Sequence, residues 1–198
     1  MSDTTLSTLK IIQDLRDQGF SVSRNFFPAT WANAARSEIL EREADFQRAG
    51  IGKLNLKQIA DDVRKDKTLW WEMSAPTIPQ KPYVEFFSQL KLDLNRELFL
   101  GLWDIEGHYA IYEEGAFYKK HLDRFKNDSK RTVSMVTFFN PDWDASNGGN
   151  LVIEHEERRI EVLPEAGTIV VFLSDSVPHE VTETRKRRFS FAGWYRTR

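Results

Sequence analysis

The stretch Arg188-Phe-Ser-Phe-Ala-Gly-Trp-Tyr195 alternates aromatic side chains with small or polar ones over most of its length. Successive side chains of a β-strand point to opposite faces, so this stretch predicts a strand with one aromatic and one roomier face. Further β-type runs precede it at short intervals, over residues 98–102, 108–112, 132–139, 150–153, 160–163 and 168–173. Many short strands separated by turn residues favour a sandwich or barrel. We therefore predict a double-stranded β-helix, or jelly roll.

Three helical patterns come before these runs. Apolar residues recur there at the spacing of one helix face, in the sets Leu6, Leu9, Ile12 and Leu15; Trp31, Ala35, Ile39 and Phe46; and Tyr83, Phe87, Leu90 and Leu94. A short strand follows Gly19, and a polar loop separates the second and third patterns. The predicted class is α+β with a mainly β core. No linker divides the chain, so we expect one domain over 1–198, with 1–97 as mainly helical support and substrate loop and 98–198 as the jelly-roll core.

Composition narrows the partners and the chemistry. The chain has 198 residues, a formal charge of −2 and no cysteine. A slightly acidic chain has no global attraction to nucleic acid or anionic membranes, and the absence of cysteine excludes disulfides and thiolate ligands. The N-terminus lacks a basic, apolar signal peptide, and no apolar run approaches the length of a membrane span. A cytoplasmic enzyme is the expectation.

His121-Leu-Asp123 and His179 form the candidate metal site. On an extended segment, residues two apart project to the same side, so His121 and Asp123 can hold one ion. His179 follows a turn-like stretch that could return the chain to the same end of the barrel. A lone His-x-Asp triplet is weak evidence, but two imidazoles with one carboxylate are typical of non-haem Fe(II) oxygenases. By contrast, His108 and His155 are expected to have structural or surface roles.

Arg188 is the candidate anchor for a carboxylate. It ends the charged run that begins at Arg185, and the earlier residues of that run suit a solvated surface. Arg188 itself opens an apolar strand nine residues after His179. A guanidinium can hold the remote carboxylate of a dicarboxylate through two parallel hydrogen bonds, which lysine cannot reproduce.

Several segments together resemble the Fe(II)- and 2-oxoglutarate-dependent dioxygenases, and among them the prolyl 4-hydroxylases of the oxygen-sensing branch. They are the Tyr-rich approach from Tyr112 to Asp123, Asn140-Pro-Asp-Trp-Asp144, Gly148-Gly149, His179-Glu-Val181, Arg188 and Trp194-Tyr195. The resemblance covers residues 60–196, including the stretch 64–71 that leads into the family's substrate loop.

The resemblance implies that His121, Asp123 and His179 bind Fe(II). It also implies that Arg188 holds the C5 carboxylate of 2-oxoglutarate and that Tyr112 lines the cosubstrate pocket. Two positions depart from the branch's pattern: Phe138 stands where a tyrosine is common, and Ala192 replaces a threonine. A hydroxyl for the cosubstrate would have to come from elsewhere, and Thr132 and Ser134 are candidates because alternation places them on the face of Phe138.

The implied activity is hydroxylation of a prolyl residue in a protein or peptide, coupled to conversion of 2-oxoglutarate and O2 to succinate and CO2. Ascorbate is a further candidate cofactor. Catalysis would need no side chains beyond the metal and cosubstrate ligands. The candidate substrate contacts are Tyr118, Arg131, Trp194 and the loop 52–71, in which Trp70 and Trp71 are expected to be core residues.

Two alternatives remain open at the level of sequence. The same oxidative chemistry could act on another side chain or on a small metabolite, because neither fold nor iron triad determines the substrate. A non-catalytic metal-binding interaction module would also retain the barrel. A nucleic-acid substrate is less favoured, because the basic residues are not interleaved with stacking aromatics over an extended stretch.

Overall fold

The structure is a computed structural model that describes residues 3–50, 62–124 and 130–198. Its helices are α1 (Asp3–Gln18), α2 (Ala29–Glu41) and α3 (Lys81–Leu98), with 3-10 turns at Glu43–Asp45 and Ala145–Asn147. The strands are β1 (Phe20–Ser23), β2 (Gln47–Arg48), β3 (Asp66–Trp70), β4 (Asp104–Tyr112), β5 (Tyr118–His121), β6 (Arg131–Phe138), β7 (Leu151–His155), β8 (Arg158–Val162), β9 (Ile169–Leu173), β10 (His179–Val181) and β11 (Arg188–Arg196).

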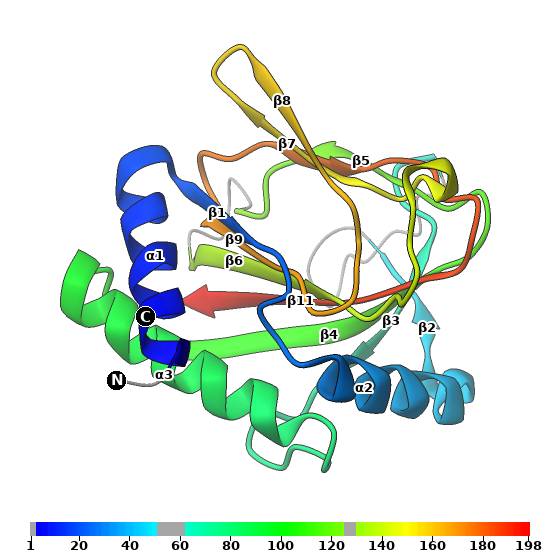
Figure 1. The fold of residues 1–198 in the computed structure, drawn as a ribbon, viewed down its shortest axis with the longest axis horizontal. Helices are drawn as coiled ribbons and strands as arrows, with labels where there is room; N and C mark the ends of the chain where they lie inside the picture. Colours follow the sequence, from blue (N-terminus) through cyan, green and yellow to red (C-terminus); the bar gives the residue numbers. More distant parts are fainter. Residues whose placement is uncertain (1–2, 51–61, 125–129) are drawn as a thin grey trace.

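The strands form two sheets that face each other. The seven-stranded sheet has the order β1-β9-β6-β11-β4-β3-β2, and the four-stranded sheet has the order β5-β10-β7-β8. All the paired strands are antiparallel. The helices lie against the large sheet, and the four-stranded sheet lies across its other face (Figure 1). This is the double-stranded β-helix that the strand pattern predicts.

Alternate side chains of β11 face either the core beneath the helices or the space between the two sheets. Phe191 stacks on Phe87 of α3 with ring centroids 5.2 Å apart, and the Tyr195 hydroxyl donates to the Phe87 carbonyl at 2.7 Å. These aromatic residues belong to the core between the sheet and the helices. Arg188 and Trp194 lie on the opposite face of the same strand, which therefore faces the small sheet.

The predicted third helix face is confirmed. Tyr83, Phe87, Leu90 and Leu94 are all fully buried in the core shared by the helices and the large sheet. In α1, Ile12 and Leu15 are buried, but Leu9 is exposed. The second helix is shorter than its pattern suggests, because α2 ends at Glu41 and Phe46 lies beyond it.

One segment joins the two sheets. Lys65 N–H donates to the Phe117 carbonyl at 3.1 Å and Lys119 N–H to the Val63 carbonyl at 2.9 Å, beside β5 of the small sheet. The same segment continues directly into β3, which pairs with β4 of the large sheet. The predicted polar loop therefore contains the strands β2 and β3. The segment that leads into β3 links the large sheet to the β5 edge of the small sheet. Residues 51–61 of the loop lie outside the described residues.

The predicted strand at 98–102 is wrong. Helix α3 continues to Leu98, Phe99 takes a left-handed conformation with φ 54°, and β4 begins only at Asp104. The Asn95 side chain donates to the Leu102 carbonyl at 2.9 Å and accepts from the Leu102 N–H at 2.7 Å. Both backbone groups of Leu102 are thus satisfied by a side chain, so they need no neighbouring strand.

The prediction that both adjacent tryptophans are core residues is half wrong. Trp71 is buried and packs against Phe191, whereas Trp70 is 49% exposed. Consecutive strand residues point to opposite faces, so only one of the two can enter the core beneath the helices. Trp70 lies on the other face, with its ring centroid 6.1 Å from that of Trp194.

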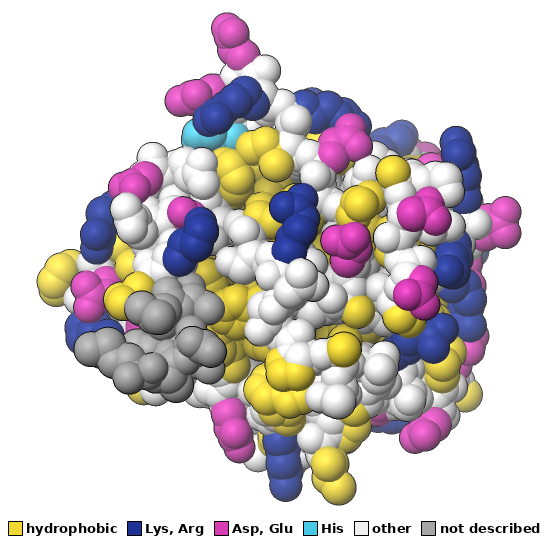
Figure 2. Space-filling model, viewed as in Figure 1, with side chains coloured by type: hydrophobic (Ala, Val, Ile, Leu, Met, Phe, Trp, Pro, Cys, Tyr) yellow, Lys and Arg dark blue, Asp and Glu magenta, His cyan; other side chains and the backbone are white. Residues whose placement is uncertain are grey.

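The surface carries both signs of charge. On the face shown in Figure 2, acidic and basic side chains are interspersed, with apolar surface between them. Among the helices that the structure describes, none is long and apolar enough to cross a membrane.

Candidate active site

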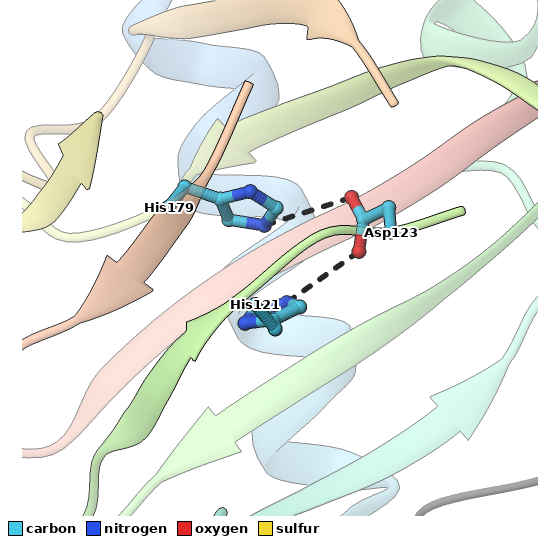
Figure 3. A group of neighbouring side chains, drawn as sticks. All are labelled: His121, Asp123 and His179. Atoms are coloured by element: carbon cyan, nitrogen blue, oxygen red, sulfur yellow. Dashed lines mark ion pairs between the residues drawn. The ribbon is translucent and has the colours of Figure 1, made fainter. Parts of the chain in front are cut away.

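His121, Asp123 and His179 meet at the edge between β5 and β10. His179 begins β10 and lies directly opposite His121, the last residue of β5. One potential ligand atom from each of the three residues lies within 4.8 Å of the others. Figure 3 shows both imidazoles beside the Asp123 carboxylate. In the described part of the chain, this is the one group of three or more such side chains that could hold a metal ion.

Backbone hydrogen bonds fix the tautomer of each imidazole. His121 Nδ1 is 2.8 Å from the Lys119 carbonyl, and His179 Nδ1 is 3.1 Å from the Val177 carbonyl. A carbonyl oxygen only accepts, so each Nδ1 carries the proton and each Nε2 keeps its lone pair. The Nε2 atoms of His121 and His179 lie 3.5 Å and 3.6 Å from Asp123 oxygens.

Electrostatics keep the two buried ligands in the protonation states that bind metal. Burial by itself would raise the pKa of Asp123, but His179, His121 and a hydrogen bond from Ser134 hold that pKa well below its usual range. Burial lowers the pKa of His179 to about 4, despite the opposing effect of Asp123. At neutral pH the site therefore offers a carboxylate anion and a neutral imidazole.

Arg188 is a buried cation that lies between the sheets. Its exposed fraction is 1%, and burial lowers its pKa to about 10. Nε donates to the Gly149 carbonyl at 2.8 Å and Nη1 to Ser190 Oγ at 3.1 Å, while the guanidinium carbon is 4.8 Å from the centre of the Tyr112 ring. In the described part of the chain, Asp66 is the carboxylate that acts on the Arg188 charge and opposes the effect of burial, but Asp66 is itself paired with Arg64. A buried guanidinium with no carboxylate of its own is an apt receptor for a ligand carboxylate.

Thr132 and Ser134, the predicted hydroxyls on β6, do not lie beside Arg188. Thr132 Oγ1 donates to the Lys130 carbonyl, and Ser134 Oγ donates to Asp123. Phe138 does lie at the guanidinium, with its ring centre 5.0 Å from the guanidinium carbon of Arg188. Ser190 supplies the hydroxyl instead. Its place two residues after Arg188, on the same strand face, was the signal that could have identified it.

Of the three candidate substrate contacts, Tyr118 lies directly against a residue of the metal triad, whereas Trp194 and Arg131 are linked to it through Ser134. Tyr118 stacks on His121 with ring centroids 3.7 Å apart and an interplanar angle of 16°. Trp194 pairs in the ladder with Ser134, which contacts Asp123, and the guanidinium carbon of Arg131 lies 3.6 Å from the Trp194 ring centre. The structure thus brings these side chains near the triad, and their role as substrate contacts stays a prediction.

A buried ion pair that the motifs did not indicate lies behind Tyr118. Arg64 donates to both carboxylate oxygens of Asp66, at 2.7 Å and 2.6 Å, and its guanidinium carbon is 4.3 Å from the centre of the Tyr118 ring. Burial alone would lower the pKa of Arg64, yet its pair with Asp66 keeps that pKa above the usual value. The two-residue spacing of Arg64 and Asp66 on an extended segment could have indicated that their side chains lie on the same side. Their burial could not be predicted, because the surrounding sequence is polar.

The remaining histidines take no part in the triad. His108 is buried beside Trp70 and Trp194, and its Nδ1 is 3.1 Å from the Tyr109 carbonyl. His155 lies at the end of β7 with its ring 5.4 Å from that of Phe20. Both residues lie outside the triad, and their structural or surface roles stay a prediction.

Comparison with known proteins identifies the family. The model described as the 2OG-Fe(II) oxygenase superfamily matches residues 107–196. A crystal structure of a Pseudomonas putida prolyl-4-hydroxylase is 36% identical to this chain, with a TM-score of 0.87, over 96% of this chain and 99% of that one. The chain belongs to the 2OG-Fe(II) oxygenase superfamily. Membership of this superfamily implies Fe(II) and 2-oxoglutarate as cofactors, and the triad supplies suitable donors for the metal.

Other proteins are also similar to this chain. Egl nine homolog 1 of Homo sapiens is 30% identical over 145 residues, which are 68% of this chain and 33% of that protein. A PKHD-type hydroxylase of Maricaulis maris is 29% identical over 86 residues, which are 43% of this chain and 39% of that protein. The chain thus spans well under half the length of these two curated relatives. A Trichoplax adhaerens prolyl hydroxylase in complex with a hypoxia inducible factor peptide has a TM-score of 0.87 at 22% identity, over 98% of this chain and 90% of that one, and so shares the fold.

Proposed function

We propose that this oxygenase hydroxylates a prolyl residue in a protein or peptide, using Fe(II), 2-oxoglutarate and O2. The choice of proline is supported by the likeness to the Pseudomonas putida prolyl-4-hydroxylase over nearly the whole of both chains. This chain also shares the fold of the Trichoplax adhaerens prolyl hydroxylase in complex with a peptide.

The observation that carries the enzymatic part of the proposal is that one barrel holds both a ligand triad and the buried guanidinium of Arg188. His121, Asp123 and His179 would hold the metal through two imidazole nitrogens and one carboxylate, which suits Fe(II) and leaves coordination positions for other ligands. Arg188 would hold the distal carboxylate of 2-oxoglutarate. The Ser190 hydroxyl next to Arg188 would supply the hydroxyl that Phe138, unlike a tyrosine, lacks.

The bound Fe(II) and 2-oxoglutarate supply the oxidising chemistry, in which 2-oxoglutarate and O2 become succinate and CO2 and an unactivated C–H bond is hydroxylated. The contribution of this chain is to bind, orient and exclude water. The Gly149 carbonyl and Ser190 fix the direction of the Arg188 guanidinium. The rings of Tyr112 and Phe138 cover that guanidinium and limit the access of water to it. No side chain is needed as a general acid or base.

Substrate recognition is assigned to the side chains that border the triad. Tyr118 would present aromatic surface to the target residue. Trp194 is 7% exposed and would support the Arg131 guanidinium that lies over its ring, and Arg131 would contact the polypeptide. Trp70, the exposed aromatic residue at the end of β3, is proposed to add to this surface. Of the predicted substrate loop 52–71, residues 66–70 form β3 in the large sheet and residues 52–61 lie outside the described residues.

An anaerobic titration tests the enzymatic part directly. Purified protein is loaded with Fe(II) and then titrated with 2-oxoglutarate while the metal-to-ligand charge-transfer absorption is followed. We expect the band to form with the wild-type protein and to weaken in both His179→Ala and Arg188→Ala. Metal binding without a 2-oxoglutarate band would instead favour a non-catalytic metal-binding module.

Product analysis tests the choice of substrate. Proline-containing peptides are incubated with the loaded enzyme and O2, and the mass and position of any added oxygen are determined. A gain of one oxygen on a prolyl residue supports the proposal. Oxygen on another side chain, or turnover only with a small metabolite, would replace it with the alternative substrate classes.

Ascorbate is expected to sustain turnover as an auxiliary reductant. Comparing the total product with and without ascorbate tests this role.

A cytoplasmic location is proposed from the sequence. Fractionation of cells that express the tagged full-length protein tests it.

A further inference from the structure

Two buried serine hydroxyls lie behind the Asp123 carboxylate. Ser134 Oγ is 2.7 Å from Asp123 Oδ2, and the Oγ atoms of Ser134 and Ser174 are 2.8 Å apart. Ser134 is on β6 and Ser174 directly follows β9, so neither belongs to the segment that carries Asp123. Their exposed fractions are 1% and 0%. A hydroxyl pair so fully removed from water is held in place by its own hydrogen bonds.

The direction of these hydrogen bonds follows from the number of protons. The Asp123 carboxylate accepts the hydrogen bond from Ser134. Ser134 has one hydroxyl proton and gives it to Asp123, so Ser174 must be the donor in the bond between the two serines. The result is a directed chain from Ser174 through Ser134 to one oxygen of Asp123. Each bond in such a chain polarises and strengthens the next.

Independent contacts hold the two ends of this chain together. Arg124 N–H, one residue after Asp123, donates to the Ser174 carbonyl at 3.1 Å. The Arg124 side chain also pairs with Asp175 at 2.6 Å. On its other side, Ser174 N–H donates to the Thr132 carbonyl at 3.1 Å and continues the ladder between β6 and β9. The segment that follows β5 is therefore fastened to the large sheet at the position of Asp123.

We propose that Ser134, supported by Ser174, is a positioning residue that fixes the Asp123 carboxylate for metal binding. This inference rests on the proposed function, because it assigns Asp123 to the metal. Asp123 lies beyond the end of β5, where no ladder restricts its side chain. The Ser134 hydroxyl donates to Oδ2 and restrains rotation of the carboxylate, so that its oxygens would be held in place for the metal. Groups that orient metal ligands in this way typically contribute about 10- to 100-fold to metal affinity.

Metal binding by the full-length protein tests this role without relying on turnover. Co(II) is titrated into wild-type protein, Ser134→Ala, Ser134→Thr, Ser174→Ala and Thr137→Val, and its visible absorption reports both affinity and coordination geometry. Thr137 is a matched control, since it is a buried hydroxyl on the same strand that donates to the Thr168 carbonyl at 2.9 Å, away from the triad. His179→Ala serves as the ligand-loss control, and thermal unfolding of each metal-free variant is measured in parallel.

We expect Ser134→Ala to weaken Co(II) binding about 10- to 100-fold and to change the Co(II) spectrum. Ser174→Ala should cause a smaller loss, Ser134→Thr should recover most of the affinity because it keeps the hydroxyl, and Thr137→Val should bind as the wild type does. Wild-type affinity in Ser134→Ala, or equal losses in Ser134→Ala and Thr137→Val, would overturn the positioning role. If His179→Ala binds Co(II) as tightly as the wild type, the metal assignment fails and the inference fails with it.

Discussion

Arg188 is the residue whose chemistry can be tested most directly. Replacing it by alanine removes the proposed partner of the 2-oxoglutarate C5 carboxylate, and losing one member of a buried charge pair costs about 2 to 5 kcal/mol of binding. Arg188→Lys should recover little, because lysine cannot form two parallel hydrogen bonds to a carboxylate. The affinity of the Fe(II)-loaded variants for 2-oxoglutarate measures both effects. Unchanged affinity in Arg188→Ala would contradict the role.

A second single-residue effect concerns His108. Burial lowers its pKa to about 4, and Arg64 adds to the shift, whereas an unfolded histidine titrates near pH 6.5. The unfolded state therefore binds more protons between these values, so this group makes the free energy of unfolding fall as the pH is lowered from about 6.5 to about 4. His108→Gln should flatten that dependence by at most about 1.4 kcal/mol per pH unit. Urea unfolding across this pH range measures it.

The control for this experiment is His155→Gln, in the hairpin of β7 and β8, which lacks the buried surroundings of His108. The slope of the unfolding free energy against pH is measured for both variants and for the wild type. Equal slopes in His108→Gln and wild-type protein would show that burial of His108 does not govern this part of the pH dependence.

At the level of elements, the turn before β7 sets the position of Arg188. Gly149 has φ +67°, and a Cβ there would lie 2.9 Å from Thr184 Oγ1 and 3.0 Å from Arg188 Cδ. Gly149→Ala should therefore displace Arg188 and weaken 2-oxoglutarate binding about tenfold, which corresponds to the low end of an overpacking cost. Co(II) affinity should not change. Both affinities are measured by titration.

Gly115→Ala is the matched control for this turn. Gly115 has a similar φ of +76°, but a Cβ there would meet no atom within 4 Å. Both variants place alanine at a positive φ, which costs about 1 to 2 kcal/mol of backbone strain. If both lose 2-oxoglutarate affinity equally, strain is the cause and not the contact with Arg188.

At the level of the whole molecule, two ion pairs of different burial bind the sheets together. Asp66 is fully buried against Arg64 in the segment that joins the sheets, whereas Arg124 and Asp175 are paired at the surface. Asp66→Ala leaves the Arg64 guanidinium buried without its partner and should lower the free energy of unfolding by about 3 to 5 kcal/mol. Asp175→Ala should lower it by no more than about 1 kcal/mol. Chemical denaturation compares the two, and equal costs would contradict the dependence on burial.

Strand periodicity predicted most of the large sheet and the burial of α3, because the runs concerned are long and have one apolar face. It predicted neither β5 nor β10. β5 has the sequence Tyr-Lys-Lys-His and shows no apolar alternation, whereas β10 has only three residues, and the pairing of both depends on neighbours far away in the sequence. The wrong strand at 98–102 has a related cause, since its apolar residues are also compatible with the end of a helix and the loop after it.

The sequence by itself determined the donor types of the metal triad, the spacing of His121 and Asp123, and the place of Arg188 on the inner face of β11. These are local properties, set by residue identity and by the two-residue period of a strand. Only the tertiary structure decided that His179 faces His121, that Ser190 and not Thr132 lies beside Arg188, and that Ser134 and Ser174 support Asp123. Ser190 lies on the same strand as Arg188, but the structure was needed to show that the hydroxyls of β6 are engaged elsewhere. The other contacts join residues from separate segments, which meet only when distant parts of the chain pack together.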